Sequence, residues 1–171
     1  MKGNVHLYTG NGKGKTTAAI GLAIRAAGAG MKVFIAQFIK GRHYNELSAL
    51  EKFEGQIVIK QYGRDCFIKN EPEEADRMAA RRGFDEVEKI VMEGAYDMVV
   101  LDEINIALYY ELVDISEVAM MIKKRPEHVE LVLTGRYAPQ SLIDLSDLVT
   151  NMDEIKHYYH NGIEARPGIE Y

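Results

Sequence analysis

The stretch TGNGKGKTT, residues 9–17, combines three glycines, two lysines and a closing pair of threonines between an apolar run and a helical pattern. Glycines let a backbone curl so that its N–H groups converge, and a helix N-terminus adds a partial positive charge of about 0.5. Lys15 can then reach phosphate oxygens, and the hydroxyl of Thr16 can hold Mg²⁺. These residue types at this spacing predict a cradle for a polyphosphate.

The cradle departs at one position from the usual phosphate-loop pattern G-x-x-x-x-G-K-[ST]. Gly14, Lys15 and Thr16 match its end, whereas Thr9 stands where the first glycine is expected. The predicted strand before and helix after the stretch supply the context that the pattern requires. We therefore expect a nucleotide-binding set made of Thr9, Gly10, Asn11, Gly12, Lys13, Gly14, Lys15, Thr16 and Thr17.

A pair of acids follows another apolar run, in YDMVVLDE. Either Asp102 or Glu103 is expected to complete the Mg²⁺ shell, directly or through water. Arg136 follows a further predicted strand, in TGR, and is expected to touch phosphate. The sequence has no guanine-reading N-K-x-D, so the residues favour ATP over GTP.

Strand and helix patterns alternate along the chain, which predicts an α/β sandwich of three layers with a mainly parallel central sheet. Pro72 is expected in the first turn of its helix and Ser116 as an N-cap. The tail 151–171 is expected to add a strand and an ordered ending. The predicted strands are 4–10, 32–38, 56–62, 96–103 and 128–136, and the predicted helices are 15–30, one within 41–55, 72–94, 116–126 and a short one within 139–149.

Ligands of such sheets bind at the carboxyl ends of the strands. The glycine-rich loop, the acid pair and TGR all fall at such ends, so they are expected to share one site.

Length and charge narrow the class of protein. The 171 residues suit a single nucleotide-binding domain, 1–171. A formal net charge of −5 argues against nucleic acid as a partner. One cysteine, Cys66, suits a reducing compartment. With neither a signal peptide nor an apolar run of about 20 residues, the chain is expected to be cytoplasmic and to bind no membrane.

Several stretches together resemble the ATP:corrinoid adenosyltransferases of the P-loop type. They are YTGNGKGKTTAAIGLAIRAAGAGMKV, QFIKG, YDMVVLDEIN, RPEHVELVLTGR and EIKHYYHNGIEARPGIEY, which cover nearly the whole chain in order. The resemblance implies a P-loop NTPase (RecA-like) fold. It also implies that a reduced corrinoid attacks the 5′ carbon of ATP, so that cobalt receives the adenosyl group and triphosphate leaves. The product serves adenosylcobalamin synthesis or salvage.

The resemblance further implies roles for individual residues. The segment 10–17 would hold the triphosphate, Thr16 and Glu103 would hold Mg²⁺ in preference to Asp102, and Lys15 would stabilise the leaving group. Lys13 and the loop N–H groups would share that task. Phe67 is the nearest match to the apolar residues that strip the lower cobalt ligand. A flavodoxin-like reductant and a homodimer are implied as well.

Two other classes of function fit the glycine-rich loop. In a small ATPase or kinase, Glu103 would activate water or an acceptor hydroxyl. In a RecA-like binding module, ATP would control binding to nucleic acid or to a partner protein. The acidic net charge disfavours nucleic acid as the target of such a module.

Overall fold

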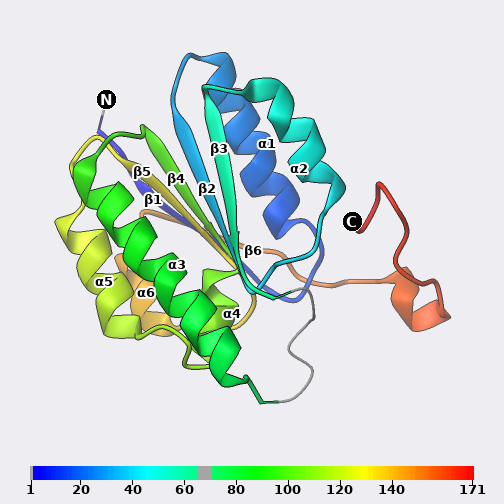
Figure 1. Ribbon diagram of the computed structural model, residues 1–171. Helices are drawn as coiled ribbons and strands as arrows, with labels where there is room; N and C mark the ends of the chain where they lie inside the picture. Colours follow the sequence, from blue (N-terminus) through cyan, green and yellow to red (C-terminus); the bar gives the residue numbers. More distant parts are fainter. Residues whose placement is uncertain (1, 65–70) are drawn as a thin grey trace.

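The computed structural model describes residues 2–64 and 71–171 and shows one sheet with helices on both of its faces (Figure 1). The described strands run in the order β3-β2-β4-β5-β1-β6, and every neighbouring pair is parallel. This confirms the predicted parallel α/β sandwich. The strands are β1 Val5–Thr9, β2 Val33–Phe38, β3 Ile57–Tyr62, β4 Met98–Asp102, β5 Glu130–Thr134 and β6 Leu148–Asn151.

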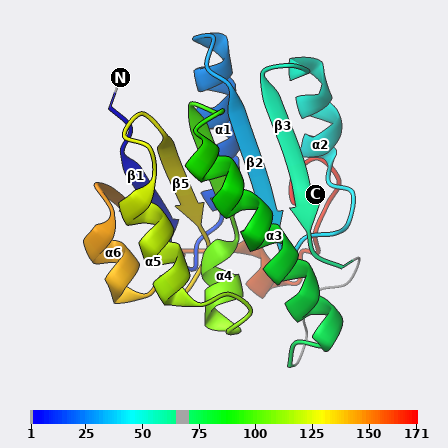
Figure 2. The same ribbon diagram turned by 60° about the vertical axis from the view of Figure 1, so that its left-hand side comes forward.

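The helices divide between the two faces (Figures 1 and 2). On one face α1 and α2 cover a cluster that includes Ala19, Ala23 and Val100. On the other face, α3, α4, α5 and α6 cover a larger cluster around Phe34, Phe84 and other residues. The helices are α1 Lys15–Gly28, α2 Asn45–Leu50, α3 Glu74–Glu93, α4 Ile104–Tyr109, α5 Ile115–Lys124 and α6 Gln140–Leu145, with 3₁₀ turns η1 Glu51–Phe53 and η2 Tyr158–Asn161.

The central strands are apolar because helices cover both of their faces. Every residue of β2 and of β4 is buried. Polar residues in these strands are therefore informative: Gln37 in β2 and Asp102 at the end of β4 are both almost completely buried. Such groups need hydrogen-bond partners in the interior.

The strand order brings the ends of β1, β2, β4 and β5 to one edge of the sheet. The chain leaves β1 through α1, crosses β5 and β4, and returns to the sheet as β2. Ligands of open parallel sheets bind at the carboxyl ends of the strands, near such a change of direction. The glycine-rich loop, Asp102 and TGR lie at this edge, as the sequence predicted.

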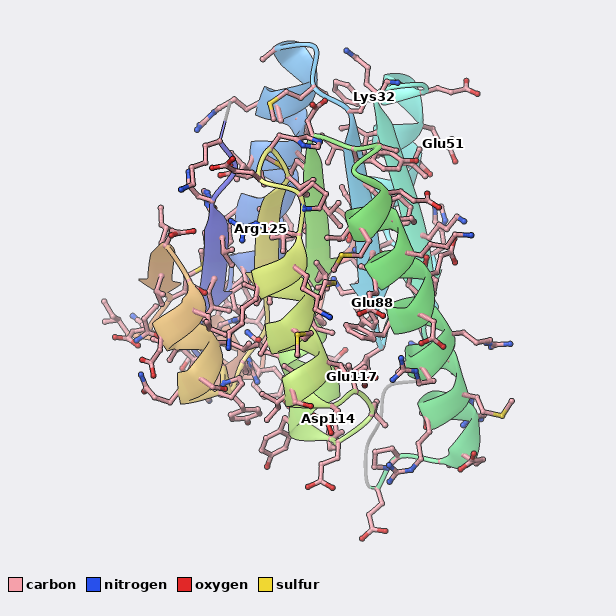
Figure 3. All side chains as sticks on the ribbon, turned by 90° about the vertical axis from the view of Figure 1, so that its left-hand side faces the viewer. Lys32, Glu51, Glu88, Asp114, Glu117 and Arg125 are labelled. Atoms are coloured by element: carbon pink, nitrogen blue, oxygen red, sulfur yellow. The ribbon has the colours of Figure 1, made fainter. Side chains whose placement is uncertain are left out.

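Three local expectations were wrong, each for a local reason. The helix α3 begins at Glu74, after Pro72, because Glu73 and Asp76 form a reciprocal capping box. The N-cap of α5 is Asp114, whose carboxylate accepts a hydrogen bond of 2.7 Å from the Ser116 amide (Figure 3). The short helix predicted within 139–149 is confirmed as α6, and the residues that follow it form β6 because the free edge of β1 offers backbone partners.

The third wrong expectation was a strand in the tail. Beyond β6 the described residues form the 3₁₀ turn η2 and irregular chain instead. The helix α4 was not predicted, since only six residues separate Glu103 from Tyr110. Among the described residues, the helices are too short or too polar to cross a lipid bilayer.

We predict that Phe84→Ala destabilises the protein by about 3–5 kcal/mol, because it opens a cavity between α3 and the sheet. The Phe84 side chain is completely buried. Urea unfolding followed by circular dichroism would measure the change. Met78→Ala on the same helix is the control, since Met78 is 55% exposed and its loss should change stability by less than about 0.5 kcal/mol. Equal effects of the two substitutions would contradict the described packing of α3.

Candidate active site

The loop between β1 and α1 is shaped by two glycines with left-handed backbone angles. Gly10 has φ 95° and Gly14 has φ 122°, a region that other residues adopt only with strain. A Cβ on Gly10 would also lie 2.4 Å from the Asn151 side chain and from the Met152 carbonyl oxygen. Glycine is therefore required there both for conformation and for space.

The Lys15 side chain points into the glycine-rich loop and is bonded to its backbone. Its Nζ donates hydrogen bonds of 2.8 Å to the Gly10 carbonyl and 2.7 Å to the Gly12 carbonyl. Burial lowers the pKa of Lys15, against the opposing pull of Glu103. Both acceptors are neutral carbonyls, so an anionic phosphate oxygen that replaced one of them would form a stronger bond, in which donor and acceptor are both charged.

The Asp102 carboxylate accepts hydrogen bonds from four different side chains. Its Oδ1 accepts hydrogen bonds from Thr16 Oγ1 at 2.8 Å and Thr134 Oγ1 at 2.7 Å. Its Oδ2 accepts from Lys40 Nζ at 2.7 Å and Gln37 Nε2 at 3.2 Å. These four donors compensate the buried carboxylate and join α1, β2, β4 and β5.

Lys40 places a cation between Asp102 and Thr16. Its Nζ also lies 3.3 Å from Thr16 Oγ1. Burial alone would lower the pKa of Lys40, but the Asp102 carboxylate outweighs burial and raises it. The hydroxyl of Thr16 and the two neighbouring carboxylates are hard oxygen donors of the kind that Mg²⁺ prefers. The residues present therefore fit a magnesium ion.

Glu103 lies at the wall of the cavity in a strained conformation. It has φ 60°, and its backbone amide donates a 2.9 Å hydrogen bond to Thr134 Oγ1. Burial and then Asp102 raise the pKa of the Glu103 carboxyl, while Lys40 and other cations oppose the rise. Left-handed residues other than glycine are costly and cluster at functional sites.

Arg136 reaches the loop from the end of β5. Its Nη2 donates a hydrogen bond of 3.2 Å to the Asn11 carbonyl. The preceding residue, Gly135, is held by Asn105, whose Nδ2 donates to the Gly135 carbonyl at 3.0 Å. The exposed Arg136 therefore lies against the glycine-rich loop.

The other loop lysine has different partners. Lys13 Nζ donates to Glu170 Oε1 and to the Ile169 carbonyl, both at 2.7 Å, and to the Tyr158 hydroxyl at 3.0 Å. These partners belong to the segment 152–171, which leaves β6 and returns toward α2 (Figure 1). Lys13 thus joins the loop to this segment, whereas Lys15 faces the interior of the loop.

A cavity of about 1160 Å³ opens above the loop. Small-molecule sites commonly measure about 300–1,000 Å³, so this cavity is slightly larger than the usual site for one small ligand. Thr9, Gly10 and Asp102 are not among its lining residues, and Phe67 is outside the described residues. The other predicted site residues line it: Asn11, Gly12, Lys13, Gly14, Lys15, Thr16, Thr17, Glu103 and Arg136.

Lys40, Gln37, Thr134 and Glu170 were not among the predicted site residues. The first three leave a signal in the sequence, because each is a polar residue inside or just after an apolar strand. Glu170 leaves no such signal, since it reaches the loop only through the course of the segment 152–171.

Comparison with known proteins identifies relatives along the whole chain. The model of the family "ATP:corrinoid adenosyltransferase BtuR/CobO/CobP" matches residues 1–171. A corrinoid adenosyltransferase of Escherichia coli K12 is 34% identical over 171 residues, covering 99% of this chain and 86% of that protein. The corrinoid adenosyltransferase CobA of Salmonella typhimurium is 36% identical with the same coverage. A corrinoid adenosyltransferase of Sinorhizobium is 35% identical over 180 residues, covering 99% of this chain and 81% of that protein.

A solved structure supports the fold. The KaiC-like protein of Pyrococcus horikoshii superposes with a TM-score of 0.62 over 91% of this chain and 75% of that chain. At 20% sequence identity this likeness concerns the fold alone.

We predict that Glu103→Gln raises the free energy of unfolding at pH 7 in the absence of metal and nucleotide. Burial raises the folded-state pKa of Glu103, so as the pH rises the unfolded chain releases this proton at a lower pH than the folded protein does. The free energy of unfolding of the wild type therefore falls with rising pH, whereas glutamine has no proton to release. The gain should vanish below about pH 4, where both states are protonated. Thermal unfolding of both proteins across this range is the measurement.

Glu164→Gln is the control for the loss of a charge, because Glu164 is exposed. A Glu103→Gln protein less stable than the wild type at pH 7 would show that the carboxylate is net stabilising.

Proposed function

The chain belongs to the ATP:corrinoid adenosyltransferase family, and we propose that the cavity above the glycine-rich loop holds ATP with its 5′ carbon open to a reduced corrinoid. The protein is an ATP:corrinoid adenosyltransferase, which acts in adenosylcobalamin synthesis. The strongest support for the position of ATP is Lys15, a buried cation inside the loop whose bonded partners are carbonyl groups.

The reaction needs no nucleophile from the protein. The reduced cobalt contributes the electron pair of the new cobalt–carbon bond, and the C5′–O bond breaks with its own pair going to the triphosphate. Negative charge therefore grows on the leaving group. Lys15, Arg136 and the N–H groups at the start of α1 lie where they can stabilise it, and such fixed donors are worth several kcal/mol in a transition state.

The chain's other task is to hold two reactants in line. Orientation inside a cavity can supply about 7–11 kcal/mol of the barrier in favourable cases. The cavity extends from the loop to residues 42–46 and to Ile106 and Tyr110 of the opposite wall. This extent supports a corrinoid beside the nucleotide.

Mg²⁺ would be held by Thr16 and Glu103, with Asp102 behind them. Glu103 lines the cavity, whereas Asp102 is 1% exposed and bonded to four donors. We therefore place Glu103 as the carboxylate nearer the ion and Asp102 as the group that orients Thr16. When bound, Mg²⁺ neutralises part of the triphosphate charge.

Three further properties stay proposals. A flavodoxin-like protein as reductant and a homodimer are supported by the family resemblance. A single nucleotide-binding domain is supported by the match of the family model to residues 1–171. Size-exclusion chromatography with light scattering would test the homodimer.

The raised pKa of Glu103 also suits a general base, so hydrolysis or phosphoryl transfer from ATP is the alternative.

One experiment separates the functions: the protein is incubated with Mg-ATP and chemically reduced corrinoid, and the visible spectrum is followed. A light-sensitive cobalt–carbon product with release of triphosphate supports adenosyl transfer. ADP and phosphate formed without corrinoid support an ATPase, and ATP-dependent retention on DNA or RNA supports a binding module.

We predict that Lys15→Ala lowers the rate of adenosyl transfer about 100-fold or more, because one charge that stabilises the leaving group is lost. The rate is measured from the change in the corrinoid spectrum at saturating ATP. Lys124→Ala is the matched control, since Lys124 is exposed at the end of α5. Near-normal turnover of Lys15→Ala would show that the triphosphate lies elsewhere.

A further inference from the structure

The segment 152–171 is attached to the glycine-rich loop by its backbone. The Met152 amide donates to the Thr9 carbonyl at 2.8 Å, and the Gly12 amide donates to the Met152 carbonyl at 2.7 Å. A Cβ on Gly12 would lie 2.7 Å from the same carbonyl oxygen. The first half of the loop is therefore pressed against the start of this segment.

A second attachment is made by side chains at the tip of the loop. Lys13 and Glu170 form an ion pair of 2.7 Å, in which the two side chains are 39% and 17% exposed. Glu170 also accepts from the Tyr158 hydroxyl and, at 2.7 Å, from the Arg166 amide. Hydrogen bonds from Lys13 and Tyr158 lower the pKa of Glu170, and the bond to Glu170 raises the pKa of Lys13.

The same segment is also tied to the far side of the cavity. Asn45 Nδ2, at the start of α2, donates to the Tyr171 carbonyl at 2.7 Å. Residues 168–171 line the cavity between these two attachments. The segment therefore spans from the loop to α2 along one wall of the site.

We propose that Glu170 is a positioning residue, which fixes residues 12–14 of the glycine-rich loop through Lys13 in the conformation that receives the triphosphate. The inference rests on the proposed function in one respect, namely that this loop is the ATP site. It assigns Lys13 to the support of the loop and leaves Lys15 and Arg136 as the cations that meet phosphate.

The residues around Lys13 explain why such support is needed. Lys13 stands between Gly12 and Gly14, and glycines have more conformational freedom to lose than other residues. A loop already held in its binding conformation loses less entropy when the ligand arrives. A single exposed ion pair contributes little, but this pair is part of a cluster in which Glu170 accepts four hydrogen bonds, two of them from Arg166.

The main competing account makes Lys13 a phosphate ligand that Glu170 holds back. The two accounts predict opposite signs for Glu170→Gln. If Glu170 supports the loop, the substitution weakens binding of triphosphate although it removes a negative charge. If Glu170 holds Lys13 back, the substitution strengthens binding.

The experiment measures the Kd of Mg-loaded inorganic triphosphate by titration calorimetry. We expect Glu170→Gln and Lys13→Met each to weaken binding about three- to tenfold. We expect the double variant to bind triphosphate no more weakly than whichever single variant binds it less well, because both substitutions break the same pair. Lys13→Arg keeps the charge and should remain close to the wild type. Glu164→Gln removes one charge from the same segment without a bonded partner in the described structure and should change Kd by less than about twofold.

Hydrogen exchange supplies a readout that needs no ligand. Peptides covering residues 9–17 and 157–171 should exchange faster in Glu170→Gln and Lys13→Met than in the wild type or Glu164→Gln. If wild-type protein fails to bind triphosphate, the proposed ATP site is wrong, while the exchange data still decide the role of Glu170. Tighter triphosphate binding by Glu170→Gln, or unchanged exchange in the loop, would overturn the inference.

Discussion

The hydrogen bonds that satisfy one buried carboxylate organise the carboxyl-terminal ends of the strands, where the candidate site lies. Asp102 is 1% exposed, and an unpaired charge at such a position would be strongly destabilising. Its donors come from α1, β2, the chain just after β2, and β5, namely Thr16, Gln37, Lys40 and Thr134. The need to satisfy this carboxylate therefore fixes the first turn of α1, and with it the glycine-rich loop, against the ends of three strands.

The cations near the site have different partners and hence different tasks. Lys40 is paired with Asp102 and Lys13 with Glu170. Lys15 is bonded to carbonyl groups, and Arg136 to the Asn11 carbonyl. Carbonyl oxygens compete with phosphate less strongly than carboxylates do. This difference supports the proposal that Lys15 and Arg136 are the cations that meet the leaving triphosphate.

Two parts of the molecule hold the glycine-rich loop in place, namely the sheet and the segment 152–171. The sheet holds the two ends of the loop, since Thr9 ends β1 and Thr16 is bonded to Asp102 of β4. The segment 152–171 holds its middle at Gly12 and Lys13. The segment is irregular apart from η2, so its bonds to the loop and to Asn45 keep it along the cavity wall. A site made in this way combines a rigid edge with a wall that is held by a few polar contacts.

The sequence by itself determined the parallel α/β fold, the place of the glycine-rich loop and the acid pair, and the family. Apolar runs, glycines and charged residues close together in the chain carry those signals, because strand burial and the turn at residues 9–17 depend on local residue types. Only the tertiary structure decided which cation meets which anion. The pairs Lys40–Asp102 and Lys13–Glu170 join residues 62 and 157 positions apart, and the bends that bring them together depend on the packing of the sheet. The proposed role of Lys13 rests on such a contact, which no local pattern records.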